Sequence, residues 1–186
     1  MSYFAAFRLP AAPARALERA VAGVARTDGF RLESAERYHV TLCHYGEIEP
    51  RDLPRLTLAL DAVARMSSPL RVRVVGAGWF PAGRVIWAGI DGDLAGLRGL
   101  RERVMDATAP LGRDSRVETG FTRGVFAPHV TVARYTASAV EPSRLVTMLR
   151  RAVDGESFEV GSFGLYESVG GRHLRLAEFS LREQLS

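Results

Sequence analysis

The tripeptide His-Val-Thr occurs twice in the chain, at residues 39–41 and again at 129–131. Each copy lies in a stretch where polar and apolar residues alternate, which is typical of a strand with one buried face. Because successive strand side chains point to opposite faces, the imidazole and the hydroxyl of each copy share one face. Each copy is followed by a loop and then by a helical pattern, so the chain contains a repeated strand–loop–helix unit.

The periodicities along the chain predict alternating strands and helices. Strand patterns occupy residues 3–9, 36–46, 70–75, 85–90, 128–134, 157–166 and 173–181. Helical patterns occupy residues 13–25, 52–65, 94–109 and 142–153. Within 36–46, alternation separates two sets of side chains: Tyr38, Val40, Leu42 and His44 on one face, and His39, Thr41, Cys43 and Tyr45 on the other. No change in composition marks a linker, so we expect one domain.

All 25 basic residues of the chain are arginines, and lysine is absent. The absence of lysine excludes a Walker-type phosphate-binding loop, a lysine Schiff base and a lysyl-nucleotide intermediate. With 21 acidic residues, the formal net charge is +4. Guanidinium groups carry paired donors that match phosphate oxygens, so this composition suits a phosphate-bearing partner without demonstrating nucleic-acid binding.

Cysteine usage and hydropathy indicate a location. Cys43 is the one cysteine, which excludes an intrachain disulfide and a zinc site of several thiolates. The sequence contains neither an apolar run long enough to span a membrane nor an N-terminal signal pattern. We therefore expect a cytoplasmic protein with no membrane partner.

Two histidines facing a shared cleft suit an in-line displacement at phosphorus. The attacking and departing oxygens lie on opposite sides of the phosphorus atom, so one wall needs a base and the other an acid. Imidazole serves in either role near neutral pH, and threonine hydroxyls suit the non-bridging oxygens. No carboxylate or thiolate accompanies the motifs at metal-ligand spacing, so we expect neither a metal nor another cofactor. A lone strand histidine is more often a packed core residue, but two copies favour catalysis.

The segments His39-Val-Thr-Leu42 and His129-Val-Thr-Val132 resemble the paired His-x-Thr-x motifs of the 2H phosphoesterase superfamily. Within it, the chain is similar to the RNA 2′,3′-cyclic phosphodiesterases, historically called 2′-5′ RNA ligases. Further stretches agree with this similarity, at residues 4–9, 46–47, 84–89 and 128–134. The resemblance covers nearly the whole chain.

The resemblance implies a bilobal α+β fold with a pseudo-two-fold axis, in which two antiparallel sheets line a central groove and helices lie outside. Residues 1–186 would form one such domain of two intertwined lobes, and a monomer is expected. The implied activity is metal-independent hydrolysis of RNA 2′,3′-cyclic phosphate to a 2′-phosphate end, with reverse 2′-5′ ligation beside it. The implied partner is RNA with a 2′,3′-cyclic phosphate or a 2′-5′ linkage.

The family's motif also implies roles for individual residues. His39 matches the proton donor to the departing 3′ oxygen, and His129 matches the base that activates water. Thr41 and Thr131 match contacts to the phosphate. Arg134, five residues after the second histidine, matches an arginine near the phosphate, with a solvated strand-end arginine as the alternative.

The chain departs from the family five residues after the first histidine. Family members often carry an aromatic residue there that stacks on a base, and this chain has His44 as the candidate substrate contact. His173 is expected to be a surface or packed histidine, and Cys43 a small filler residue. The stretch 111–126 is expected to be a long loop that borders the groove or is merely solvated; its candidate RNA contacts are Arg113, Arg116 and Arg123.

Three functions compete on this sequence. The first is an RNA 2′,3′-cyclic phosphodiesterase. The second uses the same residues on 2′-5′-linked oligonucleotides or small cyclic nucleotides. The third is a non-catalytic module that binds RNA ends. The presence of both histidines and both threonines favours an enzyme, because binding alone requires no acid–base pair.

Overall fold

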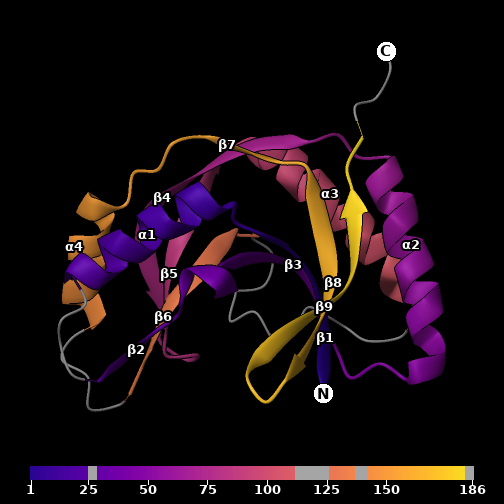
Figure 1. Cartoon of the computed structure of the whole chain (residues 1–186), viewed down its shortest axis with the longest axis horizontal. Helices are drawn as coiled ribbons and strands as arrows, with labels where there is room; N and C mark the ends of the chain where they lie inside the picture. The colour runs from indigo at the N-terminus through magenta and orange to yellow at the C-terminus, as the bar shows by residue number, and fades with distance from the viewer. Residues whose placement is uncertain (25–28, 112–125, 137–141, 183–186) are drawn as a thin grey trace.

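The structure, a computed structural model, describes residues 1–24, 29–111, 126–136 and 142–182 (Figure 1). Its strands are β1 (Ser2–Arg8), β2 (Phe30–Leu32), β3 (His39–Gly46), β4 (Leu70–Phe80), β5 (Val85–Gly92), β6 (His129–Tyr135), β7 (Phe158–Val160), β8 (Ser162–Val169) and β9 (Arg172–Ser180). Its helices are α1 (Ala11–Val24), α2 (Leu53–Arg65), α3 (Leu94–Thr108) and α4 (Pro142–Ala152). Short 3₁₀ turns are η1 (Ala35–Arg37), η2 (Pro50–Asp52) and η3 (Ala109–Leu111).

The strands form one antiparallel sheet that has two halves. The first half-sheet runs β7-β4-β5-β6, with β2 paired to β6, and the second half-sheet runs β3-β1-β8-β9. The halves meet where β3 and β6 pair through Val40 and Val130, both fully buried. The two antiparallel sheets implied by the resemblance are therefore present, and this contact joins them into one curled sheet.

The helices lie outside the curled sheet, two at each half (Figure 1). α4 packs on β4 and β5 of the first half-sheet, and α1 packs on α4. α2 and α3 pack on each other and reach β9 and β3 of the second half-sheet. The expected α+β class with outer helices is confirmed. Within the described parts of the chain, no helix has the length and apolar character needed to cross a membrane.

β3 contains two one-residue irregularities in its pairing with β1. At the first, the ladder passes from Thr41 to Cys43 and leaves Leu42 out; at the second, it passes from His44 to Gly46 and leaves Tyr45 out. Such a β-bulge shifts the alternation of side chains by one residue. Leu42 and Cys43 are both buried, and His44 returns to the face of the first motif, while Tyr45 is buried. The prediction that Tyr45 shares the motif's face and that His44 points away from it is therefore wrong.

β6 has the first of these irregularities at the same place. Its ladder with β5 passes from Thr131 to Ala133 and leaves Val132 out. Val132 and Ala133 are both fully buried, and the exposed Arg134 returns to the face of the second motif. From each histidine to the fifth residue after it, the two strands are thus alike in backbone as well as in pattern.

Other parts of the chain differ from the sequence-based expectation. β4 extends to Phe80 and forms a long hairpin with β5, and β2 has no clear signal in the sequence. The stretch expected as one strand over 157–166 divides at Gly161 into β7 and β8, which pair with β4 and β1. It therefore crosses from one half-sheet to the other. The first residues of the expected strand 36–46 belong to η1. Most of the expected loop, residues 112–125 with its three arginines, lies outside the described residues.

Gly78 of β4 provides a test of the packing between β4 and β5. A Cβ added there would overlap the indole of Trp87. We predict that Gly78→Ala lowers the free energy of unfolding by about 1–3 kcal/mol, because the ring must shift within a packed sheet. Urea unfolding followed by circular dichroism measures this loss.

Gly23→Ala is the matched control. A Cβ at this position, next to last in α1, would meet nothing within 4 Å, so this variant is expected to be as stable as the wild type or slightly more stable. A Gly78→Ala protein as stable as the wild type would contradict the close packing of Trp87 on β4.

Candidate active site

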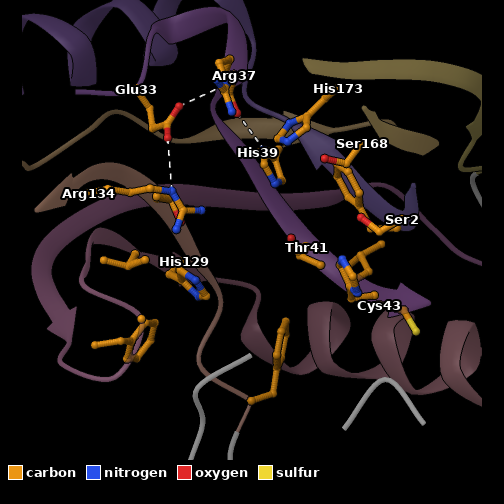
Figure 2. A pocket seen from close by; sticks show the side chains of 18 of the residues that line it. Ser2, Glu33, Arg37, His39, Thr41, Cys43, His129, Arg134, Ser168 and His173 are labelled. Atoms are coloured by element: carbon orange, nitrogen blue, oxygen red, sulfur yellow. Dashed lines mark hydrogen bonds and ion pairs between the residues drawn. The ribbon is translucent and has the colours of Figure 1, made fainter. Parts of the chain in front are cut away.

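A cavity of about 580 Å³ is lined by residues from both half-sheets. Its size falls within the range of small-molecule sites. The structure brings all the candidate site residues to this cavity: His39, Thr41 and His44 from β3, and His129, Thr131 and Arg134 from β6. Figure 2 shows His39 and Thr41 along one ribbon, with His129 and Arg134 across the cavity from them.

The pairing of Val40 with Val130 explains why the two motifs meet. Directly paired residues of antiparallel strands point to the same face, which here is the buried face. The residues on either side of this pair therefore share the opposite face, where the cavity lies. Because the strands run in opposite directions, His39 lies opposite Thr131 across the two strands. In the same way, His129 lies opposite Thr41. The two imidazoles lie on a diagonal of this arrangement.

The two histidines are anchored in the same way. His39 Nδ1 lies 2.7 Å from the carbonyl oxygen of Arg37, and His129 Nδ1 lies 3.0 Å from that of Ala127. A carbonyl oxygen only accepts hydrogen bonds, so each Nδ1 carries the proton and donates it. In each ring, Nε2 is therefore the nitrogen that gains or loses a proton. Neutral, it can act as a base; protonated, it can act as an acid.

A second ring packs edge-on against each histidine. His173 of β9 lies 5.1 Å from His39 between ring centroids, at an interplanar angle of 85°. Phe80 of β4 lies 5.1 Å from His129, at 82°. The two half-sites are thus alike in geometry and differ in chemistry, since one has an imidazole where the other has a phenyl ring. His173 is a packed histidine, as expected, and it also lines the cavity.

Burial lowers the pKa of both motif histidines. It lowers the pKa of His39 from 6.5 to about 4; the hydrogen bond to the Arg37 carbonyl opposes this shift, and the positive charges of His173 and Arg8 add to it. Burial also lowers the pKa of His129. Both imidazoles are therefore largely neutral at pH 7.

The cationic part of the cavity is organised by Glu33, which the sequence analysis did not select. This carboxylate is 8% exposed and forms ion pairs with Arg37 and Arg134. Arg134 therefore lines the cavity with a half-exposed side chain and a buried ion-pair partner. No motif in the sequence marks Glu33 as a site residue. Glu33 follows β2, and the pairing of β2 with β6 brings it to the site. For His173 a signal existed, since the chain has only four histidines.

Aromatic rings contribute to the side of the cavity near β1. Phe4 stacks on His44 with ring centroids 6.3 Å apart and planes at 6°, and it also contacts His39 at 5.2 Å. Cys43 is buried and borders the cavity, which fits the expectation of a small filler residue. Among the residues that the structure describes, no group of three or more His, Cys, Asp or Glu side chains could hold a metal ion.

Comparison with known proteins agrees with these motifs. The family described as the 2′-5′ RNA ligase superfamily matches residues 7–172. A Geobacillus stearothermophilus protein named RNA 2′,3′-cyclic phosphodiesterase is 33% identical over 136 residues, which are 71% of this chain and 41% of that protein. The chain therefore spans less than half the length of that relative. A protein of the same name from Thermus thermophilus is 30% identical over 191 residues, which cover 98% of this chain and 91% of that protein.

Solved structures show the same fold. The crystal structure of TT0787 from Thermus thermophilus superposes with a TM-score of 0.78 at 28% identity, covering 98% of both chains. Escherichia coli LigT, crystallised with 3′-AMP, superposes with a TM-score of 0.77 at 23% identity over 98% of both chains. Since the family match covers most of the sequence, including both histidine strands, the chain belongs to the 2′-5′ RNA ligase superfamily, a group of 2H phosphoesterases.

Proposed function

We propose that this protein hydrolyses RNA 2′,3′-cyclic phosphate ends to 2′-phosphomonoesters by a metal-independent mechanism with two histidines. The observation that carries the proposal is the matched pair of imidazoles, His39 and His129. Each is anchored through Nδ1 to a carbonyl oxygen two residues earlier, and both line one cavity. Relatives at 30% and 33% identity carry the name RNA 2′,3′-cyclic phosphodiesterase, which supports this substrate.

The two proton transfers divide between the histidines. His129 Nε2 accepts a proton from water as the water oxygen bonds to phosphorus. Protonated His39 Nε2 gives its proton to the 3′ oxygen as the bond between this oxygen and phosphorus breaks. The products are a 2′-phosphate and a 3′-hydroxyl, and one proton has passed in effect from His39 to His129. Exchange with solvent restores both. The assignment of acid and base follows the resemblance to the family.

Other cavity residues act on the charge of the phosphate and on the nucleoside. The hydroxyls of Thr41 and Thr131 and the guanidinium of Arg134 suit the non-bridging oxygens, whose negative charge grows in the transition state. His44, stacked with Phe4, offers a flat surface for a base. If the 5′-hydroxyl of a second RNA took the place of water, the same two proton transfers would form a 2′-5′ linkage. This ligation is the reverse of the cleavage of a 2′-5′ linkage.

The variants His39→Ala and His129→Ala test the pair. On a short RNA that ends in a 2′,3′-cyclic phosphate, each is expected to lower kcat/KM by about 10²–10⁴-fold, the usual effect of a positioned proton-transfer group. The double variant is expected to lose less than the product of the two, since the residues act as a unit. A substrate with an activated leaving group should rescue His39→Ala and not His129→Ala.

Each possible result of these experiments tests a different part of this proposal. Rescue of His129→Ala instead would reverse the two roles. Full activity of both single variants would remove the catalytic assignment. Turnover of 2′-5′-linked oligonucleotides or small cyclic nucleotides alone would replace the substrate, and binding of the RNA end without any product would indicate a binding module.

A chelator tests the absence of a metal requirement. The two imidazoles supply both proton transfers, so turnover in EDTA is expected to equal turnover in buffer. Product analysis should show a 2′-phosphate in both cases. Loss of activity in EDTA that added magnesium or zinc restores would contradict the two-histidine mechanism.

The pH dependence follows from the lowered pKa values. For the free enzyme, kcat/KM is expected to be bell-shaped, with both limbs below about pH 6.5, because burial disfavours the imidazolium form of both histidines. A bound phosphodiester anion favours imidazolium and raises the pKa of His39, so the basic limb of kcat should lie at higher pH than that of kcat/KM. Rates measured across pH 4–9 test this order. A basic limb of kcat/KM above pH 7 would contradict it.

A further inference from the structure

Glu33 links the two histidine strands from the side of the cavity. Its backbone nitrogen donates to the carbonyl oxygen of Val132 at 2.9 Å, which fixes it beside the bulge of β6. Its Oε2 lies 3.1 Å from Nε of Arg37, and its Oε1 lies 3.6 Å from Nε of Arg134. Figure 2 shows the carboxylate between the two arginines, with the Arg134 guanidinium extending from Glu33 toward His129.

The charges of this cluster do not cancel. One buried carboxylate faces two guanidinium groups, so the cluster carries a net charge of +1. A buried carboxylate needs a cation beside it, and one arginine would suffice for that. The side chains of Arg37 and Arg134 are 37% and 51% exposed, and both line the cavity. The surplus positive charge is therefore available to an anion in the cavity.

The two arginines use the same atom to bind Glu33. Both ion pairs are made through Nε, and each guanidinium group also carries terminal Nη donors of the kind that match phosphate oxygens. Each arginine also sits on a different carboxylate oxygen. Two guanidinium groups on separate carboxylate oxygens can serve two neighbouring anions.

The positions of the arginines indicate which anion each one takes. Arg134 lies on the strand of His129, next to the proposed site of reaction. Arg37 precedes His39, and its carbonyl oxygen holds the Nδ1 proton of that histidine. In RNA with a cyclic phosphate at its 3′ end, the next anion is the phosphodiester on the 5′ side of the terminal nucleotide. A free nucleoside cyclic phosphate lacks this group.

We propose that Arg37, oriented by Glu33, forms a second anion subsite that binds the phosphodiester adjacent to the reacting phosphate, so that the enzyme prefers RNA ends to cyclic mononucleotides. Arg37 is the specificity residue, and Glu33 is a positioning residue that acts through it. This inference rests on the proposed function, because it presupposes that the reacting phosphate lies between the histidines.

The test compares two substrates that differ by one nucleotide, that is, by one phosphodiester and the second adenosine it carries: adenosine 2′,3′-cyclic phosphate, and the dinucleotide ApA with a 2′,3′-cyclic phosphate end. The wild type is expected to have the higher kcat/KM on the dinucleotide. Arg37→Gln is expected to lower the ratio of the two values by on the order of tenfold, the size of a lost charge-assisted contact. With the dinucleotide, it should also lower the slope of log kcat/KM against log salt concentration by the amount that about one phosphate contact contributes.

Arg55→Gln is the matched control, since it removes the same charge from an exposed position on α2. It is expected to leave unchanged both the ratio of the two kcat/KM values and the salt dependence of kcat/KM on the dinucleotide. Glu33→Gln keeps the shape of the side chain and removes its charge, and it should lower the ratio as Arg37→Gln does. If Glu33 acts through Arg37, the double variant loses no more than Arg37→Gln alone. Thermal unfolding verifies that each variant is folded.

The outcomes are distinguishable. An unchanged ratio in Arg37→Gln overturns the subsite, and additive losses in the double variant overturn the positioning role of Glu33. Failure of the wild type to turn over either substrate overturns the proposed function instead. Calorimetric titration with adenosine 2′-phosphate and with ApA bearing a 2′-phosphate then tests the subsite by affinity, and equal effects of Arg37→Gln on both ligands would reject it.

Discussion

The contact between Val40 and Val130 is the interaction on which the site depends. It is the pairing through which β3 and β6 join the two half-sheets, and both side chains are fully buried. Burial of this pair on the inner face forces the flanking histidines and threonines onto the cavity face. A slip of one residue at this contact would place the two imidazoles on opposite faces of the sheet. The apolar pair therefore determines which side chains face the cavity, although it does not line the cavity itself.

The matching β-bulges of β3 and β6 extend this constraint along each strand. Leu42 and Val132 are both buried together with the residue that follows them. An unbroken alternation would direct the residue five positions after each histidine into the core. The bulge directs it into the cavity instead, as His44 in one half and Arg134 in the other. Equivalent positions of the two strands thus place different side chains in the cavity: the flat imidazole of His44 and the cationic guanidinium of Arg134.

The two halves share a backbone plan, but their surroundings make them unequal. His173 packs on His39 where Phe80 packs on His129, so a charge on the neighbour can act on one imidazole only. Glu33 and its two arginines lie to one side of the cavity. Burial lowers the pKa of both histidines. A pseudo-symmetric fold thus gives its two histidines unequal surroundings, which the proposed division into an acid and a base requires.

Local sequence determined the helices, most of the strands and the shared face of each His-x-Thr pair, because these depend on periodicity within a few residues. It did not determine the direction of His44, since a bulge depends on the ladder with β1. Glu33 and His173 reach the cavity through β2 and β9, which the sheet brings from distant parts of the chain. Only the tertiary structure decided these positions, because pairing between strands far apart in sequence leaves no periodic trace in either strand.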